Sequence, residues 1–227
     1  MARIVLDCFP GGRHKALTMS YDDGVTQDRR LVAIFNQHGI RGAFHLNSGW
    51  LSTKGRIEAA EVAELYRGHE VSVHGVRHHY PTRLNRESLI AELYEDRRAL
   101  ERLAGYPVRG MSYAYGDYDD RVVAQLPALG IECARTTRCD PGYGLSSDFL
   151  RWTPTCHHRD CLARGKDFLA APDRRGPLLF YVWGHSYEFD NNNNWAEIEQ
   201  FCRDLGGQAA IWYATNIEIV DYVNAMR

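Results

Sequence analysis

Long apolar runs are absent from this sequence of 227 residues, in which residues 177–183 form one of the longest. That run is far shorter than the roughly 18 residues that a membrane-spanning helix needs. The first residues also lack the apolar stretch and small-residue cleavage site of a secretory signal. We therefore expect no membrane partner and a cytoplasmic location.

The sequence also has little net charge and few cysteines. The 27 Lys and Arg residues nearly balance 29 Asp and Glu residues, so the formal net charge is −2 and no basic field exists to attract nucleic acid. Six irregularly spaced cysteines do not indicate a disulfide framework. Residues 156–161 (Cys-His-His-Arg-Asp-Cys) lack the paired spacing of a structural zinc site, and we interpret them as a loop. The oligomeric state stays open.

Strand-like and helix-like segments alternate along the whole chain, which is 44% hydrophobic. Such alternation is typical of a parallel sheet with helical crossovers. We expect an α/β barrel, closed or partly closed, with an open doubly wound sheet as the competing fold. No glycine-rich nucleotide-binding motif follows a strand. The expected strands are 16–20, 43–46, 71–73, 110–115, 131–135, 178–183 and 209–213; the expected helices are 28–38, 57–67, one from Asn85 to Gly105, 120–129, 195–205 and 216–225.

Polar residues follow several of the expected strands directly. Asp22 and Asp23 follow the first strand, His74 and His78 the third, and His185 the buried strand 178–183. In α/β barrels the carboxyl ends of the strands share one face, where active sites lie. These separate segments are therefore expected to meet in one pocket.

Each of these segments can be interpreted either as part of a catalytic or metal-binding site or as a purely structural feature. A His-x3-His pair with one carboxylate is a three-ligand metal site, although alone it is more often a surface pair. One of two adjacent carboxylates can bind metal while the other acts on a metal-bound water, whereas Asp-Asp-Gly alone is a turn. A histidine at a strand end is usually structural but can serve as a general acid. Their combination favours the chemical interpretation.

The combination resembles the NodB-type polysaccharide deacetylases, which include chitin and peptidoglycan deacetylases and acetylxylan esterases. Residues 20–24 (Ser-Tyr-Asp-Asp-Gly) match their Thr-Phe-Asp-Asp-Gly motif, and residues 68–70 (Gly-His-Glu) with 74–78 match their second motif. Residues 114–116 (Ala-Tyr-Gly) loosely match the Pro-Tyr-Gly loop, and residues 182–185 the late Leu-x-His motif. The resemblance covers about residues 13–226. It implies a single domain over 1–227, folded as a distorted (β/α) barrel with about seven strands.

The resemblance also implies roles for individual residues. Asp23, His74 and His78 would hold a divalent metal, and Asp22 would be the base that takes a proton from metal-bound water as it attacks an acetyl carbonyl. The backbone N–H of Tyr115 would stabilise the oxyanion, a contribution of roughly 3–4 kcal/mol. The late-motif histidine, His185, would protonate the leaving group. Zinc is the expected metal, although two histidines and a carboxylate also admit cobalt, nickel or iron.

The sequence departs from the family pattern in its third motif. The family's arginine, which orients the base, is replaced by Ser112, and the nearest arginine on that side is Arg109. We therefore expect Arg109 to reach Asp22. The proline of the loop is replaced by Ala114, so the loop and the substrate are expected to differ from the usual ones. The aromatic residues expected to contact substrate are Tyr187, Trp152 and Tyr113, with Trp50, Trp183 and Phe189 as further candidates.

Three functions stay open on the sequence alone. The first is metal-dependent removal of N- or O-linked acetyl groups from a carbohydrate. The second is hydrolysis of a small amide or cyclic imide on the same scaffold. The third is a sugar-binding relative without catalysis, which the joint presence of base and acid positions disfavours. An acetylated carbohydrate or a related small molecule is the expected partner.

Overall fold

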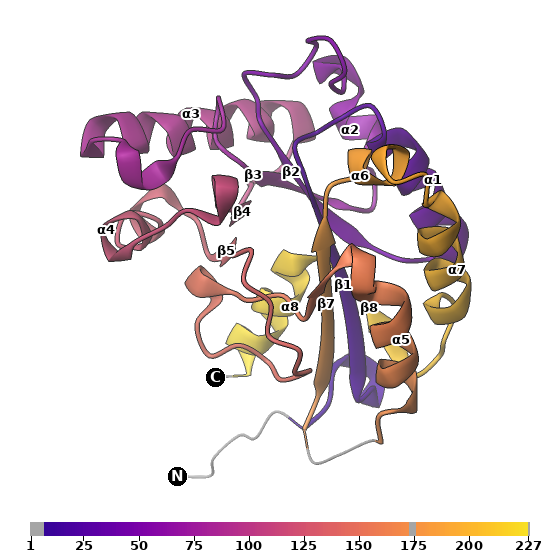
Figure 1. Cartoon of the computed structure of the whole chain (residues 1–227). Coiled ribbons are helices and arrows are strands. Elements are labelled where there is room, and N and C mark those ends of the chain that lie inside the picture. Colours follow the sequence, from indigo (N-terminus) through magenta and orange to yellow (C-terminus); the bar gives the residue numbers. More distant parts are fainter. Residues whose placement is uncertain (1–6, 173–175, 227) are drawn as a thin grey trace, which may run out of the picture.

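Eight parallel strands form one curled sheet in the computed structural model, which describes residues 7–172 and 176–226 (Figure 1). The strands are β1 (Lys15–Asp22), β2 (Gly42–Leu46), β3 (Glu70–Val73), β4 (Gly110–Ser112), β5 (Cys133–Arg135), β6 (Cys156–His157), β7 (Leu178–Gly184) and β8 (Ile211–Tyr213). The helices are α1 (Asp28–His38), α2 (Val62–Leu65), α3 (Arg86–Ala104), α4 (Asp120–Val123), α5 (Cys161–Ala170), α6 (Tyr187–Asn191), α7 (Trp195–Leu205) and α8 (Asn216–Ala225).

The order of the strands makes the sheet a distorted barrel. Seven strands follow the path β5-β4-β3-β2-β1-β7-β6, and β8 pairs with the first half of β1 while β2 pairs with the second half. The segment before β6 bridges the two ends of this path. The N–H of Trp152 donates to the carbonyl of Ala134 at 2.9 Å, and β6 then pairs with β7. The predicted barrel is confirmed.

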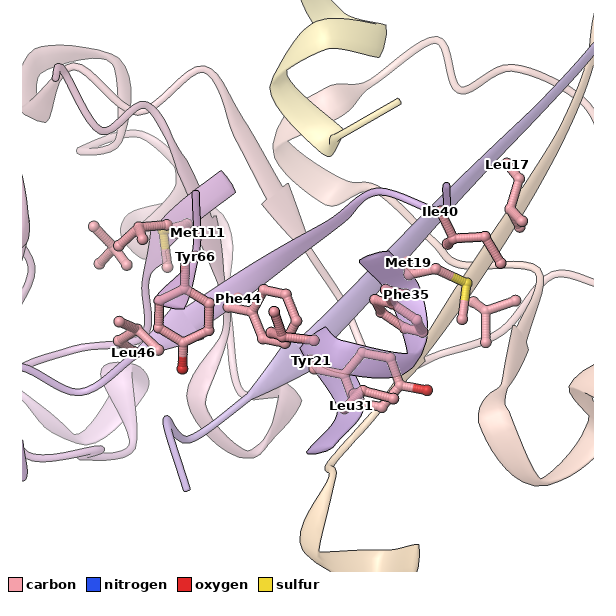
Figure 2. Packing of buried hydrophobic residues seen from close by; sticks show 14 of the residues in the cluster. Leu17, Met19, Tyr21, Leu31, Phe35, Ile40, Phe44, Leu46, Tyr66 and Met111 are labelled. Atoms are coloured by element: carbon pink, nitrogen blue, oxygen red, sulfur yellow. The ribbon is translucent and has the colours of Figure 1, made fainter. Parts of the chain in front are cut away.

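Strand β1 faces an apolar layer on one side and a polar interior on the other. Alternate residues of a strand point to opposite faces. Leu17, Met19 and Tyr21 pack with Leu31 and Phe35 of α1 and with other buried side chains, as Figure 2 shows. The alternate positions hold Ala16, the hydroxyl residues Thr18 and Ser20, and the carboxylate of Asp22, all of them buried. The strand therefore places the Asp22 carboxylate at the end of the barrel while its other face packs in the apolar core.

Helices cover the outer faces of the strands. In Figure 1, α1, α5 and α7 lie beside the long strands β1 and β7, whereas α3 and α4 lie beside the short strands β3 to β5. Helix α3 begins at Asn85, whose side chain accepts the N–H of Ser88, and it ends at Gly105 in the left-handed conformation, as predicted. Within the described ranges, no helix combines the length and apolar character needed to cross a membrane.

Two predicted helices are wrong in extent. The segment 57–67 is helical only from Ala59, because Glu58 is extended and Ile57 bonds to the carbonyl of Gly24. The segment 120–129 divides into α4 and a separate turn at Pro127–Leu129, since proline has no N–H to continue the helix. Helices α5 and α6 and the two-residue strand β6 were not predicted. Residues 156–161, predicted as a loop, contain β6, a helical turn and the first residue of α5.

Candidate active site

A cleft of about 560 Å³ opens at the carboxyl ends of the strands. The polar residues that were predicted to share one pocket all line this cleft. They come from the end of β1 and from the loops after β1, β3 and β7, and the loop after β4 also contributes to the lining. Its lining consists of Asp22, Asp23, Trp50, Arg56, His74, His78, Tyr113, Tyr115, Thr137, Trp183, His185 and Tyr187.

The backbone is strained at three of the residues that line this cleft. Asp23, His78 and Tyr115 have φ values of 83°, 56° and 60°, in the left-handed region that favours glycine. Only two other non-glycine residues in the described part of the chain share this feature. Such strain persists where the surrounding structure holds it, and it collects at functional sites.

Asp23, His74 and His78 meet as three potential metal ligands. The Asp23 Oδ1 atom lies 3.7 Å from Nε2 of His74 and 3.7 Å from Nε2 of His78. Ligand atoms at about 2.0–2.1 Å from a tetrahedral zinc ion lie roughly 3.4 Å apart. Oδ1 of Asp23 is buried and has no hydrogen-bond partner among the described residues. The donor set and its spacing therefore fit a divalent cation.

Ser112 fixes the orientation of the His74 ring. Nδ1 of His74 lies 3.0 Å from the carbonyl oxygen and 2.7 Å from the hydroxyl oxygen of Ser112, and its N–H donates to them. The Ser112 hydroxyl in turn donates to Oδ1 of Asp22 at 3.0 Å. This arrangement leaves Nε2 of His74 with a free lone pair toward Asp23, as a metal ligand requires.

Helix α3 holds the loop that carries both histidines. Buried Asp96 accepts the backbone N–H groups of Ser48 at 2.7 Å, His74 at 3.0 Å and Gly75 at 2.9 Å. One turn earlier, Glu92 accepts the N–H of Arg77 at 2.8 Å. Gly75 has a φ of 85°, and a Cβ there would lie 2.8 Å from Oε1 of Glu92. The loop is thus fastened to a long helix by two carboxylates.

Asp22 is held by Arg135, which sequence reasoning missed. The Arg135 guanidinium, fully buried, donates to Oδ2 of Asp22 and, through Nε, to the Ser20 hydroxyl at 3.1 Å. Burial works against ionisation of Asp22, but the charge of Arg135 holds the pKa of this carboxyl well below its usual range. The carboxylate is therefore ionised and held in one orientation.

The expectation that Arg109 reaches Asp22 is wrong. The Arg109 guanidinium donates to Asp221 at 2.7 and 2.8 Å and to Glu132 at 3.2 Å. Arg109 precedes β4, whereas Arg135 ends the neighbouring strand β5, beside Ser112 in the sheet. The available signal was an arginine at the end of the expected strand 131–135, because a charge that is buried in a sheet needs a partner.

His185 faces Asp22 and is backed by Glu188. Nε2 of His185 lies 3.9 Å from Oδ2 of Asp22, and Nδ1 donates to Oε1 of Glu188 at 2.7 Å. Oε2 of Glu188 also lies 3.2 Å from Nε2 of His157 and 3.1 Å from Nε2 of His158. Burial disfavours protonation of His185, but the hydrogen bond to Glu188 and the charge of Asp22 raise its pKa above the usual value.

The cluster at Glu188 explains the histidines of residues 156–161. Their rings point at the Glu188 carboxylate, while Cys156 and Cys161 are buried in the apolar core. Although His157, His185 and Glu188 also lie close enough to hold an ion, their contacts are of hydrogen-bond length. Nothing in the sequence pointed to Glu188, because two of its three partners, His157 and His158, come from a distant segment.

Tyr115 lines the cleft. Among the described residues, none accepts a hydrogen bond from its N–H, and the residue is 54% exposed. The ring stacks on Tyr80 with centroids 3.8 Å apart and meets the edge of His78 at 4.3 Å. The Tyr115 side chain therefore lies beside a candidate metal ligand.

The three aromatic residues predicted to contact substrate have different positions. Tyr187 and Tyr113 line the cleft, although the Tyr113 hydroxyl is already committed to the carbonyl of Leu150 at 2.7 Å. Trp152 does not line it; this residue is buried against Tyr181 and Phe149, because it belongs to the segment that bridges β5 to β6. Trp50 and Trp183 line the cleft, whereas Phe189 is buried in the core.

Comparisons with known proteins bear on the family and the fold. The sequence model of the family described as "Polysaccharide deacetylase" matches residues 11–134. A stretch of 55 residues, 24% of this chain, is 40% identical to "Chitin deacetylase 2" of Cryptococcus neoformans var. grubii and covers 12% of that relative's length. The match therefore spans about an eighth of the curated relative.

Two solved structures share the fold at low identity. A putative polysaccharide deacetylase from Mycobacterium smegmatis superposes with a TM-score of 0.72 at 15% identity, covering 99% of this chain and 94% of that one. A pseudoenzyme of carbohydrate esterase family 4 from Bacillus anthracis gives a TM-score of 0.62 at 15% identity, covering 94% of this chain and 67% of that one. Likeness at this identity shows the fold alone, so activity has to be argued from the residues of the site.

Proposed function

Since this chain belongs to the polysaccharide deacetylase family, whose sequence model matches more than half of it, we propose that it is a metal-dependent hydrolase that removes acetyl groups from a carbohydrate. The observation that carries the proposal is the position of Oδ2 of Asp22. This atom lies 3.8 Å from Nε2 of His74 and 3.9 Å from Nε2 of His185. A base thus stands between a metal ligand and a candidate acid.

Asp23, His74 and His78 would hold the cation, and one face would stay open to water and substrate. A divalent cation bound there would polarise the acetyl carbonyl and make a water molecule more acidic. Zinc suits two imidazoles and a carboxylate, and cobalt, nickel or iron suit them as well.

Asp22 would accept the proton of the attacking water. Arg135 and Ser112 bind one carboxylate oxygen each, so the carboxylate cannot rotate away from the cleft. Because Oδ2 has further lone pairs, it can accept a proton while it stays bonded to Arg135. A positioned general base contributes about 10²- to 10⁴-fold to the rate.

His185 would donate a proton to the leaving amine or alcohol. Its Nδ1–H is fixed on Glu188, so Nε2 faces the cleft and is the atom that can carry the transferable proton. The raised pKa of His185 increases the protonated fraction near neutral pH. The backbone N–H of Tyr115 would hydrogen-bond the oxygen that gains negative charge as the carbonyl is attacked.

Acetate release tests the proposal. The protein is stripped with a chelator, reloaded with zinc or cobalt, and assayed on N-acetylglucosamine, acetylated chito-oligosaccharides and acetylxylan. We expect metal-dependent release that Asp22→Asn abolishes. Turnover of small amides or imides without acetate release would favour the second function considered above. Sugar binding without turnover, unaffected by Asp22→Asn, would identify a non-catalytic relative.

A further inference from the structure

Arg56 is a cation of the cleft wall that the proposed reaction does not use. Its Nη1 donates to the backbone carbonyl of Asp23 at 2.5 Å, and its guanidinium lies 4.4 Å from the centroid of the Trp50 ring. Both contacts fix the position of the planar group. They place a positive charge next to the backbone of a proposed metal ligand.

The charge of Arg56 has no anionic partner in the described part of the chain. No carboxylate there comes within ion-pair distance of it, whereas the other arginine near the site, Arg135, is paired with Asp22. Asp22 and Asp23 are the only carboxylates that line the cleft in that part of the chain. Arg135 neutralises the first, and a bound cation would neutralise the second. Arg56 is therefore left as an uncompensated positive charge beside the substrate.

A half-buried guanidinium favours an ionised oxygen ligand over water. It offers several donors in a fixed plane, and its hydrogen bonds to carboxylate or phosphate are about twice as strong as neutral ones. Trp50 stacks on it and thereby limits the freedom that binding would otherwise remove. Trp50 also presents its ring to His78, with centroids 5.5 Å apart, which continues the wall toward the metal ligands.

We propose that the substrate of this site carries an anionic oxygen group, a carboxylate or a phosphate, close to its acetyl group, and that Arg56 binds it. The inference rests on the proposed function for the position of the acetyl group. Because Arg56 bonds to Asp23 itself, the anion belongs on the acetylated sugar or on its direct neighbour. Arg56 then determines which substrates bind and takes no part in bond cleavage.

Matched substrates measure this specificity. N-acetylglucosamine is the neutral reference, N-acetylglucosamine 6-phosphate supplies a phosphate, and N-acetylmuramic acid supplies a carboxylate. The readout is the ratio of kcat/KM for each anionic substrate to that for the neutral one. We expect at least one ratio above ten in the wild type and a fall of about tenfold to a hundredfold in Arg56→Gln. Whichever ratio falls identifies the anion.

Two further variants control for structure. Arg56→Lys keeps the charge and is expected to keep a preference for the anion. Arg83 also stacks on an aromatic ring near the cleft, at 4.0 Å from the centroid of Tyr80, but it does not line the cleft. Arg83→Gln should leave both ratios within about twofold of the wild type. Added salt should lower kcat/KM for the anionic substrate more than for the neutral one.

Equal losses on neutral and anionic substrates in Arg56→Gln would overturn the inference and assign Arg56 to supporting Asp23 alone. Wild-type ratios near one for both anions would overturn it as well. If no substrate is hydrolysed, calorimetric affinities of the same three sugars replace the kinetic ratios. An anion preference lost in Arg56→Gln would then uphold the inference while the deacetylase proposal fails.

Discussion

Replacing Arg135 with glutamine tests how the base is controlled. Arg135 and Asp22 form an ion pair whose side chains are 0% and 3% exposed. Removal of one partner of such a pair costs about 3–5 kcal/mol, because the other charge stays buried without compensation. Burial, which already favours the neutral form of Asp22, then acts unopposed, and the pKa of the carboxyl rises. Asp22 would be protonated at pH values where the wild type is ionised.

The expected result is a loss in kcat of about 10²-fold or more, in line with the contribution of a general base. The acidic limb of the pH–rate profile should move to higher pH. Metal content, measured by elemental analysis, should stay near that of the wild type, because Arg135 contacts none of the three proposed ligands. Arg109→Gln is the matched control, since its ion pairs are partly exposed and worth roughly 1 kcal/mol or less.

A double-mutant cycle separates this role from general damage. Arg135→Met alone should lower the free energy of unfolding strongly, whereas Arg135→Met with Asp22→Asn should recover much of the loss because no unpaired charge is left. The reasoning is refuted if Arg135→Gln keeps the wild-type pH profile, or if Arg109→Gln shifts the profile equally.

Four further variants test the metal site, the loop that supports it and the buried histidine His45. Asp22→Asn should keep its metal and lose at least about 10²-fold in acetate release, whereas His78→Ala should lose both; equal metal content in the two would contradict the division of roles. Asp96→Asn should weaken metal binding about 10- to 100-fold in a chelator competition, and an unchanged affinity would show that other contacts hold the loop. Burial lowers the pKa of His45 to about 3, so the stability it contributes is present above about pH 6.5 and falls by about 2 kcal/mol by pH 5. His45→Gln should show a correspondingly smaller drop in unfolding free energy between pH 7 and pH 5. Burial raises the pKa of Asp28 to about 7, so Asp28 changes stability in the opposite sense, but equally in both proteins. An identical pH dependence of the two proteins would therefore refute the role given to His45.

The proposed metal ligands and base could be predicted because their signals are local. Residues 20–24 form the end of β1 and the loop that begins there, and residues 74–78 directly follow β3. Parallel strands bring their carboxyl ends to one edge. Proximity of Asp23 to His74 and His78 therefore follows from topology without knowledge of any side-chain contact. His185 follows from the same rule, applied to β7.

Arg135, Glu188 and Trp152 could not be placed in the same way. The role of Arg135 depends on which face of the short strand β5 it occupies, and a one-residue shift reverses the face. Glu188 lies on the short helix α6, and two of its partners, His157 and His158, come from a separate segment. Arg135 and Arg109 both lie near expected strands, but only Arg135 points into the barrel. Trp152 lies outside the long strands, in a bridging segment with no periodic pattern of its own.

The buried surroundings of Asp22 explain why one strand combines small polar and large apolar residues. An arginine inside a barrel needs acceptors for its remaining N–H groups, and Ser20 and the carbonyl of Thr136 supply them. Ser20 is in turn 2.7 Å from Nε2 of His45, so the ion pair is enclosed by a hydrogen-bonded set. A half-satisfied set would be worse than an apolar interior. The outward residues of β1 meanwhile pack with α1, so the strand keeps its share of the core. The same strand thus keeps the Asp22 carboxylate charged and builds the core. The β1 residues that bind Arg135 alternate with the β1 residues that form the apolar layer.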